Sequence, residues 1–185
     1  MEYAIADLHV TQETMCTYSA PDGSKLRPWD TADEMDEALI ARWNAVVSPE
    51  DKVYVLGDAT GSKGIRKALR KYDLMNGVKV LLMGNHDDED SGIYLRHFRK
   101  LYGCRVLPAR RAILSHVPWH PGSLKPGWVN IHGHLHASEV TMVQGADLVA
   151  DPRYYSVSVE RIGFQPIPLD EAIDRAHAAL AASLA

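Results

Sequence analysis

Five short apolar runs constrain this sequence more than any other feature, because each run ends abruptly in Asp, Asn or His. The runs cover residues 3–6, 53–56, 78–83, 112–114 and 128–131. Short runs rich in Val, Ile and Leu are typical of strands buried on both faces of a sheet. The polar residues that follow them are Asp7, His9, Asp58, Asn85, His86, Asp87, His116, His134 and His136. Ligands gather at the carboxyl edge of such sheets, so we expect these side chains to lie close together.

Helical patterns separate several of these runs. We expect helices over residues 31–47, 63–72, 93–102 and 172–185, the first with Thr31 and Glu34 in capping-box spacing and the last capped by Asp170. Alternation of strands and helices predicts an α/β fold with right-handed crossovers. Residues 139–168 alternate more weakly, and we expect them to add antiparallel strands.

The length and charge of the chain limit what it can bind. A chain of 185 residues fits a single domain, so we expect residues 1–185 to form one domain around one core. The net charge is −4, whereas a protein that grips long nucleic acid usually carries a basic face. Stable binding to long nucleic acid is therefore not expected, while small phosphorylated substrates remain possible.

The sequence favours a soluble protein of the cytoplasm. Cys16 and Cys104 are far apart in sequence, so we expect two free thiols in a reducing compartment. The first residues lack the basic and apolar segments of a signal peptide, and no apolar run approaches the roughly 20 residues of a membrane span. The sequence leaves the oligomeric state open.

The residue types at the strand ends suit two adjacent divalent metal ions. Such ions need carboxylate, amide and imidazole ligands, and one shared anion must offset the repulsion between two cations about 3.5–4 Å apart. The strand ends supply Asp, Asn and His without thiolates. This argues against a structural zinc site, in which sulfur usually dominates.

The motifs at these strand ends resemble those of the calcineurin-like metallophosphoesterase family. They are DLH at 7–9, GD at 57–58, GNHD at 84–87, SH at 115–116 and GHLH at 133–136, in the family's order. Together with SVSVE at 156–160, they are most similar to the small bacterial and bacteriophage members. The resemblance implies a four-layer αββα sandwich of two mixed sheets flanked by helices.

The resemblance also implies a role for each matching residue. Asp7, His9 and His136 would hold one metal ion. Asn85, His116 and His134 would hold the other, and Asp58 would bridge the two. His86 would contact the scissile phosphate and protonate the leaving oxygen. Manganese is the usual ion of the family, with iron, zinc, nickel or magnesium as substitutes.

Two metal ions can lower the pKa of a bound water toward neutrality and offset the charge of a phosphoryl group, so metal-bound hydroxide can attack phosphorus. A histidine acid adds about 10²–10⁴-fold when the leaving group is poor, as in nucleoside diesters. We therefore expect a phosphodiesterase for small nucleotides such as 2′,3′-cyclic nucleotides. A phosphomonoesterase or protein phosphatase is the alternative enzyme, and a non-catalytic scaffold is the alternative of another class.

Residues outside the motifs are candidates for substrate contact. His120 follows the SH motif, and Arg27 precedes the first expected helix. Small relatives often carry Gly-His shortly after the first Asp-x-His motif, where this chain has Val10, Thr11 and Gln12. One familiar polar contact is therefore absent, and the substrate preference of relatives does not transfer directly.

Overall fold

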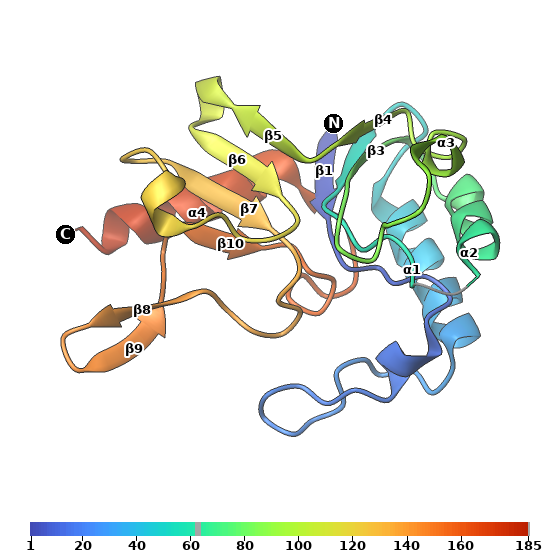
Figure 1. The fold of residues 1–185 in the computed structure, drawn as a ribbon, viewed down its shortest axis with the longest axis horizontal. Helices are drawn as coiled ribbons and strands as arrows, with labels where there is room; N and C mark the ends of the chain where they lie inside the picture. Colours follow the sequence, from blue (N-terminus) through green and yellow to red (C-terminus); the bar gives the residue numbers. More distant parts are fainter. Residues whose placement is uncertain (62–63, 185) are drawn as a thin grey trace.

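The computed structural model describes residues 1–61 and 64–184, arranged as two mixed sheets with helices packed against them (Figure 1). The first sheet has the order β11-β1-β2-β3-β4 and the second β10-β7-β6-β5. The strands of the first sheet are β1 (Glu2–Ile5), β2 (Lys52–Val55), β3 (Val78–Leu82), β4 (Lys100–Tyr102) and β11 (Ile167–Pro168). Those of the second are β5 (Cys104–Leu107), β6 (Ala112–Ser115), β7 (Val129–His132) and β10 (Tyr154–Ser156).

Parallel pairing brings the motif-bearing strand ends to one edge. β1, β2 and β3 are mutually parallel neighbours, and β6 pairs in parallel with β7. The antiparallel pairs β1–β11 and β5–β6 make both sheets mixed. All five apolar runs form strands, within a residue or so of the expected bounds.

Two hydrophobic clusters hold the layers together. The first joins one face of the first sheet to α1 (Ala32–Val46) and α2 (Ile65–Lys71), with Met35, Leu39 and Trp43 of α1 fully or almost fully buried. The second joins the other face of that sheet to the second sheet and to α4 (Leu169–Ala182). The expected α/β sandwich of two mixed sheets flanked by helices is thereby confirmed.

The expected helices are found with some corrections. α1 begins as expected, since the Thr31 hydroxyl accepts a hydrogen bond from the Glu34 amide at 3.2 Å. α2 continues into the 3₁₀ turn η2 (Tyr72–Leu74), and position 63 lies outside the described residues. α4 begins before residue 172, with Pro168 rather than Asp170 at its N-cap, and position 185 lies outside the described residues.

The expected helix over residues 93–102 is wrong. Only a short helix forms, α3 (Ser91–Tyr94), and residues 100–102 are instead β4, which pairs in parallel with β3. Tyr94 and Phe98 are both buried, and their spacing of four residues is typical of a helix. A single turn, closed by the hydrogen bond from the Phe98 amide to the Tyr94 carbonyl, is enough to place both side chains in the core. Backbone pairing with the distant strand β3 then determines the conformation of the rest.

The segment after residue 139 holds both kinds of strand pairing. The hairpin of β8 (Thr141–Gln144) and β9 (Asp147–Ala150) is antiparallel and projects away from the sheets (Figure 1). β11 is antiparallel to β1 as expected, but β10 runs parallel to β7, so the expectation of antiparallel strands is wrong there. In the described part of the chain, no helix is long and apolar enough to cross a bilayer.

The remaining short elements are 3₁₀ turns in the connections. They are η1 (Glu13–Cys16), η3 (Pro108–Arg110) and η4 (Pro121–Ser123). η1 and the long loop after it follow the β1 motif, and η4 follows the β6 motif. Both connections therefore start at the edge where the polar side chains gather.

Candidate metal centre

The first group of polar side chains consists of Asp7, His9 and His136, which come from the loops after β1 and β7. One potential ligand atom of each lies within 4.8 Å of those of the other two. The His9 and His136 rings are stacked with their centroids 5.2 Å apart. The Asp7 carboxylate accepts hydrogen bonds of 3.1 and 2.9 Å from the amide of His134.

The second group consists of Asp58, His116 and His134, from the loops after β2, β6 and β7. Their potential ligand atoms also lie within 4.8 Å of one another. His134 Nδ1 is 3.2 Å from His116 Nε2, and Asn85 Oδ1 is 3.0 Å from the same atom. The structure thus brings Asn85 to this group, where the family resemblance implies it lies.

Asp58 lies between the two groups. One of its carboxylate oxygens is 3.5 Å from His9 Nε2 and the other is 3.4 Å from His116 Nε2. Burial alone would raise the pKa of Asp58, but the His116 hydrogen bond and the His86 amide hold it down, to about 2. The carboxylate is therefore ionised at neutral pH and faces both groups with a separate oxygen.

The donors of both groups fit divalent cations. All six are nitrogen or oxygen, which suits borderline and hard ions. His9 Nε2 is buried without a hydrogen-bond partner among the described residues, and burial lowers the pKa of His9 to about 3, which leaves its lone pair free. Burial raises the pKa of Asp7 to about 6, so a cation beside Asp7 would stabilise its ionised form.

Backbone geometry sets this region apart. Five of the candidate ligands lie in the left-handed region, with φ of 59° at Asp7, 48° at His9, 49° at Asp58, 73° at His134 and 50° at His136. Non-glycine residues rarely adopt this conformation, and such strain is typical of functional sites.

Glycine is required at two positions beside these groups. A Cβ at Gly84 would lie 2.3 Å from Asp58 Oδ1, and one at Gly133 would lie 2.7 Å from Asp7 Oδ2. Any larger residue would displace the carboxylates. Glycine therefore allows the backbone to approach the carboxylates closely at both positions.

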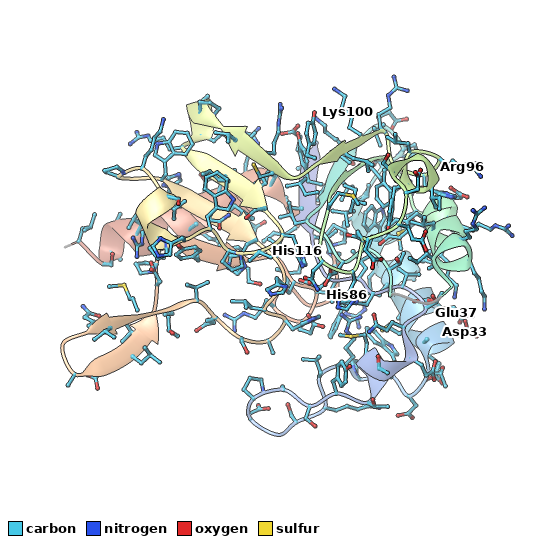
Figure 2. All side chains as sticks on the ribbon, viewed as in Figure 1. Asp33, Glu37, His86, Arg96, Lys100 and His116 are labelled. Atoms are coloured by element: carbon cyan, nitrogen blue, oxygen red, sulfur yellow. The ribbon has the colours of Figure 1, made fainter. Side chains whose placement is uncertain are left out.

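His86 lies beside the first group rather than in it. Its ring centroid is 5.3 Å from that of His9, with the rings nearly perpendicular. Figure 2 shows His86 and His116 near the middle of the molecule, between the two sheets. Asp87 fixes the same loop, because its carboxylate accepts hydrogen bonds from the amides of Gly84 at 2.9 Å and Ala59 at 3.1 Å.

The expectation that Arg27 contacts substrate is corrected by the structure. The Arg27 side chain is fully buried, and its guanidinium donates to the carbonyls of Asp7 and Leu8 at 2.5 and 2.8 Å. It also pairs with Glu160 at 2.7 Å. Arg27 is thus part of the support beneath the first group, and it is inaccessible to a ligand.

Two further residues that support the candidate ligands were not identified from the sequence. Glu160 Oε1 lies 3.2 Å from His136 Nδ1, and Gln12 Oε1 lies 2.8 Å from His9 Nδ1. Gln12 thus supplies a polar contact in the segment that departs from the pattern of small relatives. The only sequence indication of Glu160 was its place at the end of the SVSVE run.

His120 is exposed and lies outside both groups. It lines a groove that Asn85 and His116 also line, so its position next to the centre is as expected. His132 is buried, and its Nδ1 lies 2.7 Å from the carbonyl of Gly133. It therefore packs within the fold behind the motif histidines.

Comparison with known proteins assigns the chain to a family. The family model for calcineurin-like phosphoesterases matches residues 3–174. This chain belongs to that family. Its membership and the two side-chain groups together indicate a metal-dependent phosphoesterase.

Individual relatives support the same fold. An uncharacterized protein of Methanocaldococcus jannaschii is 32% identical over 170 residues, which cover 91% of this chain and 86% of the relative. A crystal structure of a protein of unknown function from Aquifex aeolicus matches with a TM-score of 0.63 and 23% identity, over 95% of this chain and 98% of that one. The second likeness bears on the fold alone.

Proposed function

We propose that this calcineurin-like phosphoesterase is a binuclear metal-dependent phosphodiesterase for small nucleotides, such as 2′,3′-cyclic nucleotides. The position of Asp58 is the main support for this proposal. Its two oxygens face His9 at 3.5 Å and His116 at 3.4 Å, so one ionised carboxylate is shared by both groups. Adjacent cations require such a shared anion.

Asp7, His9, Asp58 and His136 would hold one ion, and Asp58, Asn85, His116 and His134 the other. Manganese is the ion we expect, since carboxylate, amide and imidazole ligands suit it. Bound ions of this kind lower the pKa of water and offset the negative charge of a phosphate.

His86 supplies the proton that the leaving group needs. Its imidazole is partly exposed beside the first group, where a phosphate over both groups would be within reach. The His86 amide donates a hydrogen bond of 2.9 Å to Asp58, which fixes the backbone of His86 relative to the shared carboxylate. A proton donor matters most when an alkoxide leaves, as it does from a nucleoside diester.

The charge of the chain supports a small substrate. With a net charge of −4 it lacks the overall basic charge of proteins that grip long polyanions. A nucleotide needs only the local contacts of one phosphate and its substituents. A protein phosphatase would act on the same centre, and the experiment below distinguishes the two.

Hydrolysis by metal-stripped protein, with and without Mn²⁺, tests the proposal. The substrates are 2′,3′-cyclic and 3′,5′-cyclic nucleotides, nucleoside monophosphates, and the bis- and mono-p-nitrophenyl phosphates. We expect Mn²⁺-dependent turnover of the cyclic diesters. Turnover of monoesters alone would make the protein a phosphatase. The absence of hydrolysis with every substrate would favour a scaffold.

A further inference from the structure

A groove of 610 Å³ lies directly beside the second group. Three segments line it: the end of β3, the turn between β4 and β5, and the loop from β6 to η4. Asn85 and His116 form its inner end, so the groove is continuous with the candidate metal centre. Small-molecule sites commonly have volumes of about 300–1,000 Å³.

The outer wall of the groove is apolar and aromatic. Met83, Val117, Pro118 and Trp119 line it, and the Val117 side chain is 50% exposed. His120 and Ser123 add hydrogen-bonding groups along the wall. The groove therefore offers both an apolar surface and polar groups to a ligand.

Buried and partly buried hydrogen bonds hold this wall in place. The Trp119 amide donates to Asn130 Oδ1 at 2.8 Å, and the Trp119 carbonyl accepts from the Tyr154 hydroxyl at 2.6 Å. Asn130 is fully buried and donates in turn to Ser115 Oγ at 3.0 Å, while that hydroxyl donates to the Val117 carbonyl at 2.8 Å. Since the loop is ordered in advance, little entropy is lost when a ligand binds against it.

The lining also restricts what chemistry the groove accepts. Among the described residues that form it, none is Asp, Glu, Lys or Arg. A second phosphate or an acidic peptide would find no opposite charge there. A flat, uncharged group with a polar edge meets both an aromatic surface and hydrogen-bonding partners.

We infer that this groove is a binding site for the nucleobase of the phosphoester, with Trp119 as the stacking surface. The inference rests on the proposed function, because it places the base of the substrate whose phosphate lies at the metal centre. It goes further by assigning specificity to a loop outside the metal-binding motifs. A second phosphate or an acidic peptide would need charged partners at the same place.

Two cyclic diesters with the same reacting ring test this site. Adenosine 2′,3′-cyclic phosphate carries a base, and glycerol 1,2-cyclic phosphate does not. In Mn²⁺-loaded protein, we expect Trp119→Ala to lower kcat/KM about tenfold for the adenosine substrate, by loss of stacking, and to change it less than about twofold for the glycerol substrate. Trp119→Phe keeps an aromatic face and should retain most of the activity. Equal losses with both substrates would overturn the inference.

A matched control is Trp128→Ala. Trp128 is also partly buried but precedes β7, at the strand end opposite the motifs, where Lys125 lies over its ring at 5.3 Å. This variant should leave the ratio of the two kcat/KM values unchanged. A changed ratio would show that any loss of tryptophan has the effect, and would overturn the assignment to Trp119.

A binding measurement separates this inference from the proposed function. Saturation-transfer NMR detects adenosine on metal-free protein, where no hydrolysis occurs. We expect transfer to the adenine protons, lost in Trp119→Ala and in Gly103→Leu. Gly103 lines the groove, and a Cβ there meets nothing within 4 Å, so the new side chain has room to occupy it. Adenine transfer without diester turnover would retain the base site and reject the diesterase. Diester turnover together with adenine transfer that neither variant changes would retain the diesterase and reject the base site in this groove.

Discussion

The two groups of candidate metal ligands share Asp58 but differ in what supports them. Behind the first group lies a buried ion pair, in which Arg27 binds the Asp7 carbonyl and Glu160 contacts His136. Behind the second, His116 Nδ1 lies 2.9 Å from the neutral carbonyl of Leu56, and Asn85 opens onto the groove. Charged side chains thus support Asp7 and His136 of the first group, whereas a neutral carbonyl supports His116 of the second.

This difference predicts that the two groups bind their metal ions with different affinities. Outer partners of ligating histidines orient the ring and raise its basicity, and a carboxylate does so more strongly than a carbonyl. We therefore expect the first group to hold its ion more tightly, and the second to adapt to the substrate. The predictions below test that contrast.

Asp58→Asn should have the largest effect, because it removes the charge that both groups share. An amide cannot offset two adjacent cations, and each metal ion contributes several kcal/mol to catalysis, so we expect a loss of about 10³-fold or more in kcat/KM. Metal content by mass spectrometry of the native protein should fall at the same time. Asp73→Asn, which changes an exposed carboxylate paired with His97, is the matched control. Full activity in Asp58→Asn would contradict the role of Asp58 as the anion that both groups share.

Arg27→Leu should destabilise the fold itself, because it breaks a buried ion pair behind the first group. The variant removes the guanidinium charge from the buried Glu160 carboxylate, which keeps its contact with His136, and breaking a buried ion pair costs about 3–5 kcal/mol. Urea denaturation measures the free energy of unfolding.

The comparison variant is Arg175→Leu, which breaks the exposed pair with Glu171 and should cost less than about 1 kcal/mol. Equal destabilisation by the two leucine variants would mean that Arg27 does not brace the first group.

The candidate ligands could be located from sequence because each lies within four residues of a strand end. Strand identity was recoverable from short apolar runs, and parallel pairing then brought the ends together. Arg27 was misassigned because its burial depends on Glu160, which lies 133 residues away in the chain. The helix expected over residues 93–102 was wrong for a related reason, since pairing of β4 with β3 is a long-range contact. Local sequence patterns carry no information about the burial of Arg27 or about the pairing of β4 with β3.

His86→Gln should separate chemistry from metal binding. The variant keeps both groups of ligands, so metal content should be unchanged. We expect turnover of a cyclic nucleotide to fall about 10²-fold or more, because an alkoxide leaving group needs a proton. Bis-p-nitrophenyl phosphate, with its good leaving group, should be much less affected. Normal turnover of the nucleotide by this variant would eliminate the proton-donor role.

Glu160→Gln should have the smallest effect of these variants, and it tests whether the two groups differ in metal affinity. The amide is nearly the same size and can still accept from Arg27 and contact His136, but it supplies no negative charge to the guanidinium or to the imidazole. Loss of such an outer partner typically costs about 10–100-fold in metal affinity. Calorimetric titration of metal-stripped protein with Mn²⁺ should therefore show one weakened binding step and one unchanged step. Glu171→Gln, at an exposed position of α4, should change neither. If both steps weaken equally, the two groups form one cooperative unit and their different supports do not matter.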